Sequence, residues 1–197
     1  MIIYTCITDN YDVLQPITNL PKGWRAVCFS DSEQTADGWE HVRLPFEPLL
    51  HRKVKAMPAE YLGNHERSLW IDGNLRYYGN WKEFDKWGFW VMQHPNRTKL
   101  SEEIEACIDL GKDGQHIRPL LAHYGEQKLY ATGVMIRTNS AHNQRFGKLW
   151  WDEIYTHSHR DQLSFGYIAA KTGTKVEKLP FLKQFVKSKH TSKCAGM

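Results

Sequence analysis

The sequence predicts an α/β fold: a single domain with a mixed, mostly parallel central sheet flanked by helices. Segments with strand character alternate with segments of helical periodicity along the chain, as in other α/β proteins. Several of the strands are short apolar runs bounded by turn residues, a pattern typical of strands buried on both faces. The length of 197 residues suits one domain with a sizeable core.

The first half of the chain is expected to hold three strands, a helix and then the central strand. Residues 2–7 and 24–29 are apolar runs that each lead to a hydroxyl residue and an aspartate, and residues 39–44 form a third, short strand. Residues 51–62 have helical periodicity, and Pro58 is expected to kink this helix or end it early. Residues 68–71 form the central strand, which runs into Asp72-Gly73-Asn74.

The second half is expected to hold four helices between further strands. An aromatic-rich segment at 75–90 leads into a strand at 89–92. Ser101 is the expected N-cap of a helix that ends near Gly111, and residues 117–124 form the next helix. A strand at 129–137 is expected to be interrupted at Gly133 for the close approach of a ligand. Two helices follow, at 143–157 and from Asp161 to about Gly173, before a last strand or extended segment at 176–182.

Composition and charge limit the classes of protein to which this chain can belong. The longest apolar runs fall short of the roughly 20 residues that span a bilayer, and the N-terminus lacks the basic region of a signal peptide. Three of the four cysteines lie in apolar segments and none forms a C-x-x-C pair, which indicates reduced thiols and a cytoplasmic setting. The four are Cys6, Cys28, Cys107 and Cys194.

Residues 183–197 are predicted to form a basic tail after a domain at 1–182. The lysines of this tail either attract phosphate groups or serve only for solubility. They are Lys183, Lys187, Lys189 and Lys193.

Several catalytic motifs are absent from the sequence. P-loop, G-x-G-x-x-G and G-x-S-x-G patterns do not occur, which excludes the corresponding nucleotide sites and serine hydrolases. No close cysteine or histidine pair has metal-ligand spacing, and His157-Ser158-His159 is interpreted as the end of a helix.

Asp72-Gly73-Asn74 is the most informative stretch. It follows a buried strand, and open α/β sheets bind their ligands at the carboxyl ends of strands. Carboxylate and amide oxygens suit Mg²⁺ or Mn²⁺. A plain turn is the alternative, because Asp-Gly and Gly-Asn are common turn dipeptides. Asp9 or Asp12, and Asp31, stand at comparable positions after the first two strands.

Two further polar stretches have two interpretations each. Arg160-Asp161-Gln162 at a helix start would suit a polyhydroxylated ligand, although aspartate at this position also serves for capping alone. His94 and Arg97 either clamp an anion or hold a structural loop together.

Four motifs occur in the order of a known family: IYTCITDNYD at 3–12, WIDGN at 70–74, HPNR at 94–97 and RDQLSF at 160–165. From Tyr4 to about Tyr167 the chain resembles the glycosyltransferase-like domain of bacterial and phage polysaccharide or capsule proteins and plant Golgi mucilage-related proteins. That family is similar to GT-A nucleotide-sugar transferases, so the resemblance implies one GT-A-like, Rossmann-like catalytic domain. The D-x-D motif of those enzymes holds a divalent cation, and Asn74 stands here at its third place.

The resemblance also implies roles for individual residues. Nucleotide-binding residues would be Thr5, Thr8, Asp9 and Tyr11, assisted by Asp31, with Arg52 and Lys55 offsetting the diphosphate charge. Mn²⁺ or Mg²⁺ would be held by Asp72 and Asn74, with His190 either a third ligand or part of a free tail. Asp161 would be a base or sugar ligand, and Gln162 and Arg160 would hold sugar or phosphate oxygens.

The implied activity is transfer of a sugar from a nucleoside-diphosphate sugar, with UDP-sugars favoured, to a hydroxyl group. A glycan or surface polysaccharide is the expected acceptor, in the cytoplasm of a bacterial or phage-infected cell. One alternative is a phage enzyme that glycosylates hydroxylated bases in DNA, with salt-dependent binding through its lysines. Another is a nucleotide-sugar-binding domain without catalysis.

Overall fold

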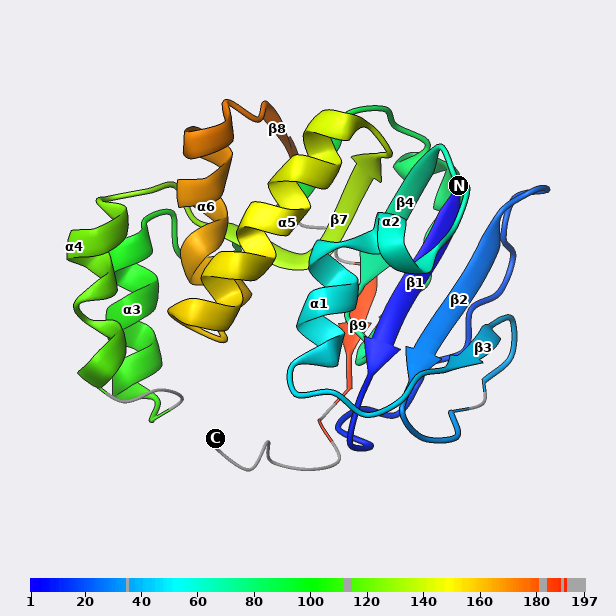
Figure 1. Cartoon of the computed structure of the whole chain (residues 1–197). Helices are drawn as coiled ribbons and strands as arrows, with labels where there is room; N and C mark the ends of the chain where they lie inside the picture. The colour runs from blue at the N-terminus through cyan, green and yellow to red at the C-terminus, as the bar shows by residue number, and fades with distance from the viewer. Residues whose placement is uncertain (35, 112–114, 181–183, 189, 191–197) are drawn as a thin grey trace.

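A mixed seven-stranded sheet runs through the part of the chain that the structure describes (Figure 1), in the order β3-β2-β1-β4-β7-β6-β8. The structure is a computed structural model that describes residues 1–34, 36–111, 115–180, 184–188 and 190. The strands are β1 (Ile2–Ile7), β2 (Arg25–Ser30), β3 (Glu40–Arg43), β4 (Arg67–Ile71), β6 (Phe89–Gln93), β7 (Tyr130–Thr138) and β8 (Val176–Leu179). β7 is antiparallel to both of its neighbours, whereas the other pairs are parallel, which confirms the predicted mostly parallel sheet.

The helices follow the predicted order with shifted boundaries. They are α1 (Leu50–Ala56), α2 (Pro58–Tyr61), α3 (Leu100–Asp109), α4 (Leu120–Tyr124), α5 (Ala141–Thr156) and α6 (Asp161–Thr172), with short 3₁₀ turns η1 (Trp81–Phe84) and η2 (Gln115–Ile117). Pro58 ends the first helix early, as predicted, because it starts α2. The predicted cap at Ser101 is wrong. Lys99 is the N-cap of α3, and the Ser101 hydroxyl donates to Glu126 instead.

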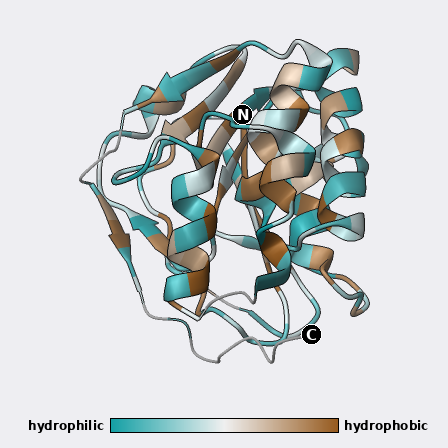
Figure 2. Ribbon diagram, turned by 90° about the vertical axis from the view of Figure 1, so that its left-hand side faces the viewer, coloured by the Kyte–Doolittle hydropathy of each residue, from teal (hydrophilic) through white to brown (hydrophobic). Residues whose placement is uncertain are grey.

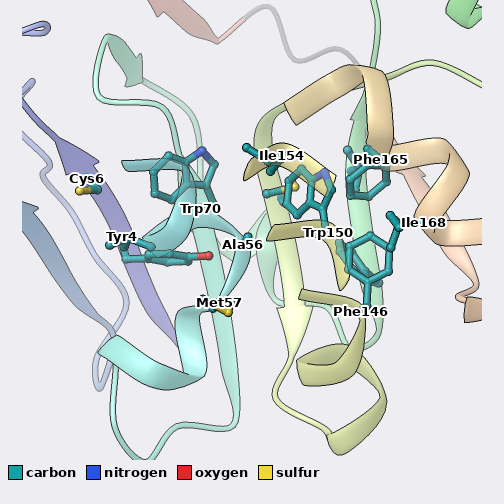
Figure 3. Packing of buried hydrophobic residues seen from close by; sticks show 14 of the residues in the cluster. Tyr4, Cys6, Ala56, Met57, Trp70, Phe146, Trp150, Ile154, Phe165 and Ile168 are labelled. Carbon is teal, nitrogen blue, oxygen red and sulfur yellow. The ribbon is translucent and has the colours of Figure 1, made fainter. Parts of the chain in front are cut away.

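One face of the sheet is covered by α1, α5 and α6. Side chains from these helices and from the strands beneath them form the largest core cluster among the described residues (Figure 3). Large aromatic side chains fill it: the rings of Phe89 and Phe146 lie 4.9 Å apart and those of Trp150 and Phe165 lie 5.1 Å apart, both edge to face. Such contacts add to the stabilisation that burial of apolar area provides. This core fixes α1 and α6 over the sheet, and both helices contribute to the site described below.

The opposite face is covered by a small ribbon of two antiparallel strands, β5 (Leu75–Tyr77) and β9 (Phe185–Lys187), together with η1. The ring of Phe185 lies 4.8 Å from that of Tyr77, so apolar packing holds β9 in place. Figure 2 shows hydrophobic residues gathered between the layers. Part of the stretch predicted as a basic tail therefore forms a strand. Lys183, Lys189, Lys193 and Cys194 lie outside the described residues.

α3 and α4 lie beside the sheet, next to α6 (Figure 1). They share a separate apolar cluster that includes Ile104, Tyr124 and Leu163. Cys6, Cys28 and Cys107 are buried free thiols, as predicted. No described helix has the length and apolar character needed to cross a lipid bilayer.

Candidate functional site

The end of β4 meets the middle of β7 at Asp72. Because the two strands are antiparallel, Ile71 pairs with Val134, and the Asp72 backbone N–H donates to the Gly133 carbonyl oxygen at 2.9 Å. A Cβ on Gly133 would lie 3.0 Å from Asp72 Oδ2. The strand assignment of β7 is continuous through Gly133, but its pairing with β6 shifts register there, from Met135 opposite Val91 to Ala131 opposite Met92. The predicted interruption is therefore present as an irregularity of the ladder and not as a break in the strand. The lack of a side chain at Gly133 makes room for the carboxylate of Asp72.

The turn that follows Asp72 is equally restricted. A Cβ on Gly73 would lie 2.7 Å from Ile7 Cγ1 and 3.4 Å from Asp12 Oδ2. A side chain at this position would collide with the end of β1, so glycine allows the turn to pack against that strand. The same close approach brings the Asp12 carboxylate near the Asp72 turn.

Asp161, the first residue of α6, is the centre of a buried ion cluster. It is 4% exposed, and its Oδ2 lies 2.6 Å from Lys55 Nζ while its Oδ1 lies 2.6 Å from Arg52 Nη1. The hydroxyl of Thr132 donates to Oδ2 at 2.8 Å. The side chain does not cap α6, so the interpretation of Asp161 as a capping residue is wrong.

The neighbours of Asp161 keep it ionised. Burial by itself raises the pKa of this carboxyl, but the charges of Arg52 and Lys55 and the hydrogen bonds from Lys55 and Thr132 outweigh it. The net pKa lies below the ordinary aspartate value. Such a carboxylate accepts a proton poorly at neutral pH, because efficient general bases have a pKa near the working pH. Arg52 and Lys55 both reach it because residues three apart share one face of a helix.

Lys55 links the two aspartates. Its side chain is 1% exposed, and its Nζ lies 3.3 Å from both Asp72 Oδ1 and Thr132 Oγ1, in addition to its contact with Asp161. Trp70 Nε1 also donates to Asp72 Oδ1 at 2.8 Å. One oxygen of Asp72 is therefore fixed by two donors, while the side chain as a whole is 40% exposed. Asp72 is the solvent-facing member of the cluster.

His51 adds a neutral polar group on the same helix. Its Nδ1 lies 3.2 Å from the hydroxyl oxygen of Thr8, which follows β1. Burial, followed by the positive charges of Arg52 and Lys55, lowers the pKa of His51 to about 3. The imidazole is thus uncharged at neutral pH and ties the loop after β1 to α1.

Lys55, Asp72 and Asp161 line a pocket of about 200 Å³. Its other polar lining includes Asn74, Thr132, Gln162, His94 and Lys187. Both charge signs and several hydrogen-bonding groups thus surround one small volume, a composition suited to a polar ligand carrying negative charge.

Of the motif residues His94, Arg97, Arg160 and Gln162, His94 and Gln162 line this pocket. The Arg97 side chain pairs with Glu103 at 2.6 Å, and the Arg97 backbone N–H donates to His94 Nδ1 at 2.9 Å. Both contacts favour the structural interpretation of that loop. Gln162 Nε2 donates to the Tyr130 carbonyl at 2.9 Å. Arg160 is the N-cap of α6 and is not part of the pocket lining.

A second group of polar residues surrounds His190. Its Nδ1 lies 2.6 Å from Asp12 Oδ1, and its ring stacks on Tyr11 with centroids 4.3 Å apart. Burial, together with the charge of Asp72, raises the pKa of Asp12, although His190 acts in the opposite direction. His190, predicted as a metal ligand beside Asp72 or as part of a free tail, is held by Asp12 and Tyr11.

Asn74 is engaged by the same C-terminal segment. It is 2% exposed, its side-chain Nδ2 donates to the Ser188 carbonyl at 3.4 Å, and its backbone carbonyl accepts from the Ser188 backbone N–H at 2.9 Å. The backbone carbonyl and the side-chain amide of Asn74 thus both attach Ser188, which follows β9, to the turn that follows β4.

Asp72, Asp12 and His190 offer the donor types that divalent cations accept. Carboxylate oxygens suit Mg²⁺ and Mn²⁺, and imidazole suits later transition metals. Their ligand atoms are not gathered as closely as around one ion in this conformation, however. Burial is the main cause of the raised pKa of Asp12, and the charge of Asp72 adds to it. A cation between the two carboxylates would relieve their repulsion.

The remaining predicted nucleotide ligands lie around the end of β1. Thr5 is buried within that strand, and its hydroxyl has no hydrogen-bond partner among the described residues. Both oxygens of Asp31 accept from the Asp9 backbone N–H at 3.1 Å. Asp9 has a left-handed φ of 55°, a conformation that is uncommon for residues other than glycine but that aspartate tolerates better than most, and this bond holds it in place.

Four contributing residues were not among the predicted ligands: Thr132, His51, Trp70 and Asp12. The first three lie inside a strand or helix, and no local sequence signal separates them from structural residues. Asp12 had a signal, since it shares the polar loop after β1 with Asp9. Only its contacts with His190 and the Asp72 turn identify it as the more informative of the two.

A family model described as TOD1/MUCI70, glycosyltransferase-like domain, matches residues 54–192. The matched range covers more than half of the chain and includes Lys55, Asp72, Asp161 and His190. It begins after β1 and β2, so the motif at 3–12 lies outside it. Comparison with curated proteins finds no match.

Proposed function

The chain belongs to the TOD1/MUCI70 family of glycosyltransferase-like domains, and from this premise we propose that it transfers a sugar from a nucleoside-diphosphate sugar to a hydroxyl group. UDP-sugars are the favoured donors, and the hydroxyl belongs to a glycan or surface polysaccharide. The observation that carries this proposal is the pocket at the end of β4, where Asp72 faces solvent beside the buried Lys55–Asp161 pair.

The donor diphosphate lies at the mouth of this pocket. Lys187 lines it from β9, and Lys55 and Arg52 supply positive charge from α1. Asp161 does not act as the base, because its pKa lies below the ordinary value and its oxygens are occupied by cations and a hydroxyl. It is a positioning residue that orients Arg52 and Lys55, and Gln162 beside it is a candidate sugar contact.

The nucleoside lies along the loop after β1. Thr8, Asp9 and Tyr11 border that loop, and Asp31 fixes its turn through the Asp9 N–H. Hydroxyl, carboxylate and aromatic groups are the types that bind a ribose and stack on a base. The buried hydroxyl of Thr5 stands on the strand that leads to this loop.

Asp72 and Asp12 would hold a Mn²⁺ or Mg²⁺ ion, with His190 orienting Asp12 and Asn74 anchoring the turn. Such ions are commonly bound by one or two carboxylates plus substrate phosphates. The ion would stabilise the negative charge of the departing nucleoside diphosphate. A positively charged, oxocarbenium-like sugar forms in reactions of this class, and nearby carboxylates favour it.

Turnover of candidate donors tests this function without knowledge of the acceptor. The wild-type protein is incubated with individual nucleotide sugars and Mn²⁺, and release of the nucleoside diphosphate is measured. We expect one donor class to be hydrolysed and Asp72→Asn to abolish the release. Asp152→Asn, at an exposed position of α5, is the matched control and should leave it unchanged.

Two outcomes would contradict the proposal. Release by Asp72→Asn at the wild-type rate would show that the reaction takes place elsewhere. Absence of release with every donor, accompanied by measurable donor binding, would instead favour a nucleotide-sugar-binding domain that does not catalyse transfer.

A further inference from the structure

Three potential metal ligands meet on a different part of the molecule, where α4 packs against the end of α5. His123 belongs to α4, Glu153 lies in the last turns of α5, and His157 is the C-cap of that helix. None of the three lines the pocket beside Asp72. The spacing of these residues in the sequence does not predict the site, because His123 is distant in sequence from the other two.

The ligand atoms are close to the arrangement that a zinc ion requires. His157 Nδ1 lies 3.0 Å and His123 Nε2 lies 3.7 Å from Glu153 Oε2, and all three atoms lie within 4.8 Å of one another. Zinc bonds of about 2.0–2.2 Å to nitrogen and oxygen place tetrahedral ligands roughly 3.3 Å apart. The two imidazole rings stack with their centroids 4.5 Å apart, so the histidine side chains would turn from this stacked arrangement to direct both nitrogens at one ion.

The charge of Glu153 is a second, independent indication. The residue is 8% exposed, and among the described residues no lysine or arginine forms an ion pair with it. The described residues that contact its carboxylate are the two histidines and Tyr124, whose hydroxyl donates to Oε2 at 3.3 Å. Buried carboxylates are ordinarily paired with a cation or coordinate a metal. A divalent ion held between the two histidines and Glu153 would supply such a cation.

We propose that His123, Glu153 and His157 bind a zinc-type divalent ion that clamps α4 to α5. Two imidazoles and one carboxylate favour Zn²⁺ over Mg²⁺ or Ca²⁺, which prefer oxygen ligands alone. The side chains of His123 and His157 are 42% and 38% exposed, so solvent can supply a fourth ligand. Tyr124 holds the carboxylate in position from outside the coordination sphere.

Two local consequences follow from this geometry. The hydroxyl of Thr156 lies 2.8 Å from His157 Nδ1, so it cannot donate to that nitrogen while the nitrogen binds a metal. The ion would also join the α3–α4 pair, which lies to one side of the sheet, to the helix that packs over the main core (Figure 1). Metal binding should therefore stabilise the α3–α4 segment most.

Calorimetric titration of the metal-stripped full chain with Zn²⁺ tests the proposal. The titration is performed in an Asp72→Ala background, so that the pocket at the end of β4 does not contribute. We expect His123→Ala and His157→Ala to weaken Zn²⁺ binding at least tenfold, a reduction of the size that loss of metal-site contacts produces. His159→Ala removes an exposed histidine two residues away and should bind Zn²⁺ as the background does.

A second readout excludes loss of folding as the cause. Zn²⁺ should raise the melting temperature of the background protein and of His159→Ala but not of His157→Ala, whose exposed side chain can be removed without opening the core. Equal Zn²⁺ affinity in the background protein and all three histidine variants, or no binding by the background protein, would overturn the proposal. Neither result depends on the donor-binding pocket or on sugar transfer.

Discussion

Lys55 Nζ lies 2.6 Å from Asp161 Oδ2, and both side chains are almost completely buried at the wall of the pocket. The contact joins α1 to the start of α6, two helices that are far apart in the sequence. It also places Lys55 within 3.3 Å of Asp72, the exposed carboxylate at the end of β4. The stability of the fold and the geometry of the candidate site therefore depend on the same ammonium group.

Replacement of Lys55 by methionine should destabilise the protein strongly. The variant keeps most of the side-chain volume but leaves Asp161 with less neutralising charge, and breaking a buried ion pair costs about 3–5 kcal/mol. Urea unfolding measures the effect. Lys171→Met, at an exposed position of α6, is the control and should stay within about 0.5 kcal/mol of wild type.

The double variant Lys55→Met/Asp161→Asn identifies the cause. If the charge pair is responsible, the double variant should be clearly more stable than the sum of the two single losses predicts. Strict additivity would show that Lys55 acts through packing alone.

Unfolding stability should fall on acidification because of His51. Its folded pKa of about 3 lies below the ordinary value of 6.5, so the unfolded chain takes up the proton first. Full stability is thus present above about pH 6.5 and is lost as the pH falls from there toward 3, by up to about 1.4 kcal/mol per pH unit. Urea titrations at pH 7, 6 and 5 should show a shallower decline for His51→Gln than for wild type, and equal slopes would refute this assignment. The lowered pKa of Asp161 also makes the protein less stable on acidification, but only once the pH falls to the ordinary pKa of an aspartate and below.

Gly133→Ala should weaken cation-dependent donor binding while leaving the fold intact. The new Cβ would lie 3.0 Å from Asp72 Oδ2, so the carboxylate must move away from the position that Lys55 and Trp70 define. We expect about a tenfold loss of donor affinity in the presence of Mn²⁺, equivalent to about 1.4 kcal/mol. The same substitution in an Asp72→Ala background is the control. A further loss in that background would mean that Gly133 acts independently of Asp72.

His190→Ala should lower Mn²⁺ affinity by about 10- to 100-fold, the range found when a residue that orients a metal ligand is removed. The reason is that His190 holds the Asp12 carboxylate at 2.6 Å. Mn²⁺ titration in the presence of donor measures the change, with His142→Ala, an exposed histidine at the start of α5, as the control. Unchanged affinity in His190→Ala would remove both His190 and its contact with Asp12 from the metal site.

The parts of the fold that the sequence predicts are those with strong local patterns. The apolar runs at β1, β2 and β4 and the apolar stripe of α5 each identify their element without knowledge of the partner. β5 and β9 have three residues each, too few for a period-two pattern, and they form because Phe185 packs against Tyr77. Sequence patterning therefore predicts the main sheet but not the ribbon that covers it.

Site residues that stand at the ends of strands or the starts of helices could be predicted from the sequence. Contacts between residues on distant elements could not. Asp72 and Asp161 stand at boundaries that the sequence marks. The direct contact of Asp161 with Lys55 depends on how α6 packs beside α1, which no local spacing encodes. Likewise, the choice between Asp9 and Asp12 depends on the course of the chain after β9, because His190 contacts Asp12.

The most direct test of the central claim is calorimetric titration of wild type and Asp72→Ala with UDP and UDP-sugars, with and without Mn²⁺. The claim predicts that wild type binds at least one of these ligands, that Mn²⁺ tightens the binding, and that Asp72→Ala loses the Mn²⁺-dependent part. Absence of binding in both conditions would contradict the assignment of the pocket to a nucleotide-sugar donor. Equal Mn²⁺-dependent affinity in the two proteins would contradict the role of Asp72.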